Sequence, residues 1–181
     1  RISEQLRLGA AVHTPTLYSI EETYSTNLTT HFASERFTES SLYNYFEYDL
    51  ITPWKAIVSA STIFNKNIII SADYEIIDYT FSEMSSYDYA FETENDAIKN
   101  TYTQAANIRL GAEVNVKPFV LRSGYAKYGS ALANKDFSRE NFSFGLGVNN
   151  GGYFFDVAYV LSQGMDEHKL YSENYITPVT L

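Results

Sequence analysis

In the segment Asn107-Ile108-Arg109-Leu110-Gly111-Ala112-Glu113-Val114-Asn115-Val116, two kinds of side chain alternate without interruption. The odd positions are polar, charged or glycine, and the even positions are aliphatic. Because successive side chains of a β-strand point to opposite faces, this pattern predicts a strand with one charged face and one apolar face. In a soluble sheet the apolar face would meet a core, whereas in a transmembrane β-barrel it would meet lipid and the polar face would line the lumen.

The same alternation predicts strands along most of the chain, whereas no segment has the periodicity that predicts a helix. The Thr- and Tyr-rich stretch up to Glu39 is predicted to extend the first strand, and Thr52-Pro53 is predicted to kink the second. The predicted strands are 6–13, 42–64, 68–81, 102–116, 119–128, 142–149 and 153–161.

Short and long connections alternate between these predicted strands. The short ones are 65–67, 117–118 and 150–152, and the last carries the Asn-Gly pair of a tight hairpin turn. The long ones are 82–101, 129–141 and the stretch after Ser162. Short periplasmic turns opposite longer extracellular loops are typical of outer-membrane barrels.

Charges and aromatic residues follow the same alternation. The charges of the central segments share the polar parity: Arg7, Lys55, Asp73, Glu75, Arg109, Glu113, Arg122 and Asp156. The opposite parity is apolar there, with Thr62 and Ser123 as small polar exceptions. Aromatic side chains are predicted to form two membrane-interface belts: Tyr74, Tyr125, Phe142 and Tyr159 in one, and Phe64, Phe119 and Tyr153 beside the short turns.

Composition excludes several functional classes. The chain has 181 residues, no cysteine and a net charge of −9, so disulfides, thiol catalysis and nucleic-acid binding are not expected. No run approaches the roughly 18 apolar residues that a membrane helix needs. The predicted fold class is therefore all-β, an antiparallel transmembrane β-barrel, with no cofactor, no metal site and no enzymatic activity.

Six segments of the chain resemble the outer-membrane long-chain fatty-acid transport family (FadL, also called the FadL/TodX family), most closely members of the Bacteroidetes type. They agree with it in order and spacing over nearly the whole chain, and each alone is weak because barrel strands resemble one another. The segments are Arg7-Leu8-Gly9-Ala10-Ala11-Val12-His13-Thr14-Pro15, Thr52-Pro53-Trp54-Lys55, Ile70-Ser71-Ala72-Asp73-Tyr74-Glu75 with Asp78-Tyr79, Asn107-Ile108-Arg109-Leu110-Gly111-Ala112-Glu113, Leu121-Arg122-Ser123-Gly124-Tyr125-Ala126 and Phe144-Gly145-Leu146-Gly147.

This resemblance implies a fourteen-stranded barrel with an N-terminal hatch in the lumen. Residues 1–181 would form one partial barrel domain, the C-terminal half, without the hatch, the first strands and the last strand. The implied function is passive uptake of hydrophobic molecules across the bacterial outer membrane, with long-chain fatty acids as the expected substrate. Outer-membrane lipid and lipopolysaccharide would be the surroundings.

The charges that we expect to face the lumen are the candidate ligand-binding residues: Arg7, Asp73, Glu75, Arg109, Glu113, Arg122 and Asp156. They would either guide a substrate or form salt-bridge networks that hold a hatch. Asp73 and Glu75 lie two residues apart on one strand, so their proximity does not indicate acid–base catalysis. Alternatives are an aromatic-hydrocarbon channel, a structural barrel without transport, and a soluble β-sandwich that acts as an adhesin or carbohydrate-binding module.

The connection 82–101 leaves two further questions open. Its acidic part, 83–96, would either bind a divalent cation or be a solvated loop. The aromatic stretch 87–91 would either lie over the barrel mouth as an apolar entry site or pack on neighbouring loops.

Overall fold

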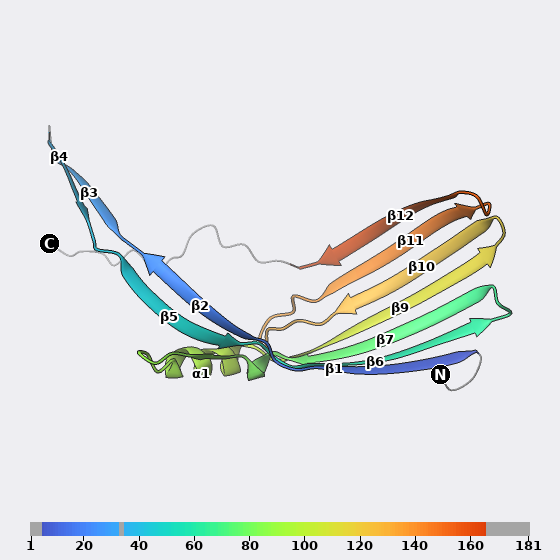
Figure 1. Cartoon of the computed structure of the whole chain (residues 1–181), viewed down its shortest axis with the longest axis horizontal. Helices are drawn as coiled ribbons and strands as arrows, with labels where there is room; N and C mark the ends of the chain where they lie inside the picture. Colours follow the sequence, from blue (N-terminus) through green and yellow to red (C-terminus); the bar gives the residue numbers. More distant parts are fainter. Residues whose placement is uncertain (1–4, 33–34, 166–181) are drawn as a thin grey trace.

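Antiparallel strands dominate the computed structural model, which describes residues 5–32 and 35–165 (Figure 1). Seven of them form one curved sheet in the order β1-β6-β7-β9-β10-β11-β12. These strands are β1 (Leu6–His13), β6 (Lys55–Phe64), β7 (Ile68–Asp78), β9 (Gln104–Val116), β10 (Phe119–Tyr128), β11 (Arg139–Asn149) and β12 (Phe154–Gly164).

The strand predictions are confirmed with small changes at the ends. β1 and β10 have the predicted bounds, and β11 begins three residues before the predicted start at Phe142. The third predicted strand was too long, because β7 ends at Asp78 and the 3₁₀ helix η1 (Tyr79–Phe81) follows. The Asp78 carboxylate accepts hydrogen bonds from the Thr80 backbone N–H and hydroxyl, and this capping favours the start of η1 at Tyr79.

All the short connections lie at one end of the sheet, here called the short-turn end (Figure 1). Asn65 and Lys66 adopt positive φ angles of 47° and 62°, and Gly151 has a φ of 80°, as tight hairpin turns require. The connections of β1 to β6, β7 to β9 and β10 to β11 lie at the opposite, long-loop end. The predicted alternation of short and long connections is confirmed between residues 5 and 165.

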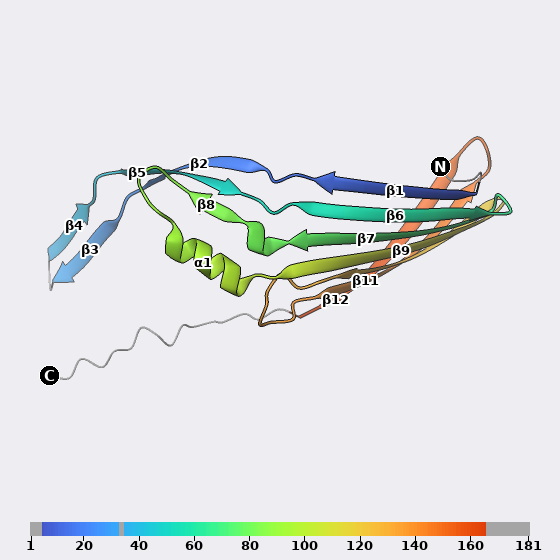
Figure 2. The ribbon, with the colours of Figure 1, turned by 90° about the horizontal axis from the view of Figure 1, so that it is seen from below.

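A long β-ribbon extends from the long-loop end (Figures 1 and 2). It continues β1 and β6, and the break at 52–54 separates β5 from β6 at the predicted kink. The predicted extension of the first strand is confirmed as far as Phe32 and not to Glu39, because residues 35–40 pair antiparallel with 27–32 and belong to the returning part of the ribbon. One part is a three-stranded sheet and the other a two-stranded tip. The strands are β2 (Leu17–Tyr24), β5 (Asn44–Ile51) and β8 (Glu83–Ser85), then β3 (Asn27–Phe32) and β4 (Glu35–Ser40).

The sequence-based expectation of no helix is wrong, because α1 (Glu92–Thr101) forms within the long acidic connection. Most of its surface is exposed and polar, so no apolar periodicity marks it. The Asn95 side chain holds it on β8, accepting from the Met84 N–H and donating to the Met84 carbonyl, both at 2.8 Å. No helix in the described part of the chain is long and apolar enough to cross a membrane.

Aromatic side chains join this connection to β5. Phe91 is buried and lies with its ring centroid 6.0 Å from that of Phe46 and 5.7 Å from that of Tyr48. The Tyr48 hydroxyl donates a hydrogen bond to Glu22 at 2.9 Å, and this bond raises the pKa of Tyr48. The end of the aromatic stretch 87–91 therefore packs on the neighbouring ribbon, which was the second of its two predicted roles, although Tyr87 itself is fully exposed.

The large sheet is open, because β1 and β12 are its two edges and do not pair with each other. Within the described residues only three apolar side chains are buried, Phe91, Ala105 and Val120. Neither smaller sheet covers the large one, since both lie beyond the ends of its strands (Figures 1 and 2). The large sheet thus has two uncovered faces, and their chemistry differs.

Candidate functional site

One face of the seven-stranded sheet, here called the charged face, carries all eight predicted charges. The register places Glu75 opposite Asn107, Asp73 opposite Arg109, and Glu113 opposite Arg122, so their side chains are neighbours on one face. The same pairing connects Arg7 and Lys55 on β1 and β6, and Asp156 on β12, to this face. The predicted common parity is confirmed.

The opposite face, here called the apolar face, exposes large hydrophobic side chains on every strand. They include Leu8, Val12, Val58, Phe64, Ile70, Tyr74, Ile108, Leu110, Val116, Phe119, Leu121, Phe142, Phe144, Leu146, Phe155, Val157, Tyr159 and Leu161. Charged and amide side chains occur on this face only near the long-loop end: Asp78, Gln104, Lys127, Glu140 and Gln163. Lys127 and Glu140 pair there at 3.5 Å. The result is an apolar band with a polar rim.

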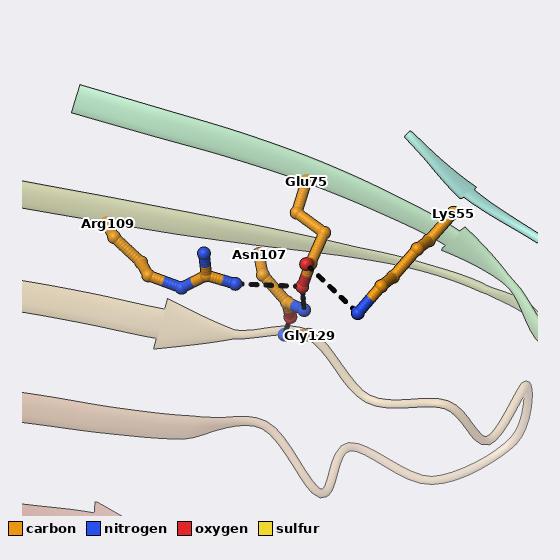
Figure 3. Close-up of polar contacts among 5 residues, drawn as sticks. All are labelled: Lys55, Glu75, Asn107, Arg109 and Gly129. Carbon is orange, nitrogen blue, oxygen red and sulfur yellow. Dashed lines mark hydrogen bonds and ion pairs between the residues drawn. The ribbon is translucent and has the colours of Figure 1, made fainter. Parts of the chain in front are cut away.

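Four side chains on the charged face converge near the long-loop end, and we call them the Glu75 cluster (Figure 3). Glu75 is only 5% exposed and accepts hydrogen bonds from Asn107 Nδ2 at 2.7 Å and Arg109 Nη2 at 2.9 Å. Lys55 Nζ lies 4.0 Å from its other carboxylate oxygen. Two cations and one amide therefore satisfy one buried carboxylate, as a buried charge requires.

Asn107 also ties the cluster to the base of a long loop. It is 8% exposed, and its Oδ1 accepts a hydrogen bond from the Gly129 N–H at 3.1 Å (Figure 3). A Cβ atom at Gly129 would lie 2.8 Å from the Ala106 carbonyl oxygen, so only glycine fits this close approach. The Glu75 cluster thereby fixes where the 129–138 loop leaves the sheet.

A second group, the Arg122 cluster, lies closer to the short-turn end. Arg122 donates through Nε to Glu113 on β9 at 2.8 Å and through Nη1 to Asp156 on β12 at 2.5 Å. It reaches Asp156 across β11, where a Cβ at Gly145 would lie 3.3 Å from the Arg122 Cβ and a Cβ at Gly147 would collide with the Asp156 carboxylate. These two glycines therefore make room for the Arg122 and Asp156 side chains.

Two of the candidate residues remain outside these clusters. Asp73 lies beside Arg109 in the register and Arg7 lies beside Ser61, but neither forms an ion pair with another described residue. Asn107 was not among the candidates. Its position on the polar parity of its strand was visible in the sequence, but its pairing with Glu75 depends on the register of two distant strands.

Small residues separate the two clusters on the charged face. The register aligns Ser61, Ser71, Gly111, Gly124 and Ser143 across five strands. Several of them line a hollow of about 460 Å³ that is bordered by Glu113, Arg122 and Asp156. The surface therefore offers hydroxyls, exposed backbone and paired charges.

The acidic connection does not form a metal site in the described part of the chain. No three histidine or acidic side chains there are placed so that they could hold a metal ion together. Its acidic residues are instead distributed over β8, the following loop and α1.

Comparisons with known proteins inform the fold of this chain. No protein-family model matches the chain, and no curated protein matches it. A solved structure described as the CymD monoaromatic hydrocarbon channel superposes with a TM-score of 0.54 at 16% sequence identity. The match covers 90% of this chain and 44% of that one, so this chain spans less than half of the channel's length. The likeness is one of fold.

Proposed function

We propose that this chain is part of the wall of an outer-membrane channel through which hydrophobic small molecules cross passively. The observation that carries the proposal is the two-faced sheet, with its exposed apolar band on one side and charged clusters on the other. Such a band would be unstable in water, because large contiguous apolar patches are rare on soluble proteins. In a bilayer it is the surface that an outer-membrane barrel presents to lipid.

The soluble β-sandwich is the alternative from a different class. It would bury the apolar face under a second sheet, whereas both smaller sheets lie beyond the strand ends (Figures 1 and 2). The alternation of short and long connections also has no role in a sandwich. Both observations favour the membrane wall.

A membrane wall needs further strands along its edges. Unpaired N–H and C=O groups on β1 and β12 would cost several kcal/mol each in the bilayer core. The CymD channel is more than twice as long as its region that aligns with this chain. We propose that additional strands pair with both edges and close a barrel, and that the charged face then lines its lumen.

Two substrate classes fit this proposal. The sequence resemblance favours long-chain fatty acids, and the neighbour's description favours monoaromatic hydrocarbons. A fatty acid carries a carboxylate that a cation would recognise, and Arg7 is an exposed cation of the charged face with no ion pair to another described residue. A hydrocarbon would need no such partner.

The first experiment tests the wall itself. The complete protein is refolded from urea into detergent micelles, and boiled and unboiled samples are compared by electrophoresis. A boiling-dependent mobility shift, with β-type circular dichroism only in detergent, supports a closed membrane barrel. A protein that folds in water without a shift would overturn the proposal.

The second experiment separates the substrates. Cells that lack their own uptake channel and carry the complete protein are given radiolabelled oleate or toluene, with Arg7→Gln and Lys66→Gln variants in parallel. If a carboxylate is recognised at Arg7, only Arg7→Gln lowers oleate uptake, and toluene uptake is unchanged. Lys66 is the matched control because it lies in a short turn away from the charged face.

A further inference from the structure

The apolar face contains a hollow that the proposed function does not use. It has a volume of about 720 Å³, within the range of about 300–1,000 Å³ that is usual for ligand pockets. The apolar side chains that line it come from four adjacent strands and are Leu8, Ala10, Val58, Ala60, Ala72, Tyr74, Ile108 and Leu110. We call this hollow the alanine groove.

The groove arises from a change in side-chain size along the register. Ala60 and Ala72 pair with each other on β6 and β7, and Leu8 and Leu110 stand on either side of them on β1 and β9. In the next row Val58 pairs with Tyr74. Large side chains therefore surround two alanines, and a pit remains between them.

We propose that the alanine groove binds the acyl chain of a membrane lipid. The side chains that line it from the apolar face are hydrocarbon except for the Tyr74 hydroxyl, so they offer a water molecule almost no partners. A flexible hydrocarbon chain fills an irregular apolar pit without leaving polar groups unpaired. The groove is also continuous with the apolar band, which on the proposed function is in contact with lipid acyl chains throughout.

The continuous strand pairing indicates from which side of the sheet the acyl chain comes. β1, β6, β7 and β9 are paired without a break past the groove, so no opening through these strands connects it to the charged face. Gly9, Ser59 and Asp73 also border the groove, but their side chains belong to the charged face. A molecule in the lumen has no path through this part of the wall, and the ligand must come from the surrounding bilayer. This inference rests on the proposed membrane location.

The test uses native mass spectrometry of the complete protein. The protein is reconstituted into vesicles of phosphatidylethanolamine and phosphatidylglycerol, extracted with mild detergent, and examined for retained phospholipid. Ala60→Phe and Ala72→Phe fill the groove, whereas Val157→Phe adds bulk to the same face on β12, outside the groove. We expect one retained lipid on the wild type and on Val157→Phe, and at least a threefold lower retained fraction on both groove variants.

Each other outcome has a distinct meaning. The groove would not be the lipid site if Ala60→Phe, Ala72→Phe and the wild type retained phospholipid equally. The same conclusion would follow if Val157→Phe lost as much phospholipid as the two groove variants. Displacement of the lipid by free oleate would assign the groove to the transported solute. A dimer mass that is present in the wild type and lost in Ala60→Phe would assign the groove to a second copy of the protein. Either result would contradict the proposal that the groove binds a lipid acyl chain. A protein that inserts and retains no lipid refutes only the groove, whereas a protein that never enters vesicles refutes the proposed function.

Discussion

The two charged clusters of the sheet use the same residue types in opposite surroundings. In the Glu75 cluster the carboxylate is buried and is held by Arg109 and Asn107, which continues to the loop base at Gly129. In the Arg122 cluster the cation is central, and its side chain and that of Asp156 are both 44% exposed. Burial, and not the number of short contacts, should therefore decide how much each cluster contributes to stability.

The largest effect is expected from Glu75→Gln, which leaves Arg109 and Lys55 without their carboxylate. Loss of one partner from a buried pair costs about 3–5 kcal/mol, and we expect about 2–4 kcal/mol here because both cations are more than a third exposed. The measurement is the urea-unfolding midpoint of the complete protein in vesicles. Asp73→Asn, the neighbouring carboxylate without a described ion pair, is the control. If Glu75→Gln and Asp73→Asn lowered the unfolding midpoint equally, burial of the carboxylate would not explain the stability of the Glu75 cluster.

Asn107→Ala should have the second-largest effect. It removes one donor to Glu75, which keeps Arg109, and one of the two acceptors of the Gly129 N–H, which also donates to the Ala106 carbonyl at 3.1 Å. Each lost hydrogen bond costs about 0.5–1.5 kcal/mol net. The distinguishing readout is hydrogen exchange at 129–138, which should accelerate in Asn107→Ala and not in Asn141→Ala on the same face. Unchanged exchange would show that the cluster does not anchor this loop.

Arg122→Gln should destabilise the protein less than Asn107→Ala, because exposed ion pairs are worth little. The loss should shrink further in high salt, since screening weakens exposed pairs more than buried ones. Unfolding midpoints at low and high sodium chloride, compared between Arg122→Gln and Glu75→Gln, provide the test. A salt-independent loss above that of Glu75→Gln would reverse the ranking of the clusters.

Lys55→Met is expected to have the smallest effect, below about 0.5 kcal/mol. Its ammonium lies 4.0 Å from Glu75 and is 39% exposed, so Arg109 and Asn107 satisfy the carboxylate without it. The same unfolding assay measures the change, with Lys66→Met in a short turn as the control. A loss comparable to that of Asn107→Ala would mean that the Lys55 ammonium stabilises Glu75 as much as Asn107 does.

Most of the sheet could be predicted from alternation alone, because the strands separate polar from apolar side chains over their central parts with few exceptions, such as Ser123 on the apolar face and Ile57 on the charged face. The bounds of β1 and β10 needed nothing further. The helix α1 could not be predicted in this way. It carries little apolar surface and depends on the Asn95 side chain pairing with Met84, a contact across eleven residues that no local pattern marks.

The sequence predicts which face carries the charged residues of the two clusters, but not which of these residues contact one another. Parity placed Glu75, Arg109, Glu113, Arg122 and Asp156 on one face, but it does not indicate which of them meet. The registers of β7 with β9 and of β9 with β10 decide that, and they depend on turn geometry and on pairing between distant segments. Arg122 bonding to Asp156 depends in addition on glycines of the strand between them.

The open edges of the sheet suggest a use in engineering. β1 and β12 each present a full row of backbone donors and acceptors to whatever strand lies beside them. If the proposed function holds and the additional strands were produced as a separate polypeptide, the two pieces would recover these hydrogen bonds only by meeting inside the same bilayer. If each piece were fused at its long-loop end to one half of a split fluorescent protein, fluorescence in living cells would appear only when the two pieces assemble in the proposed membrane.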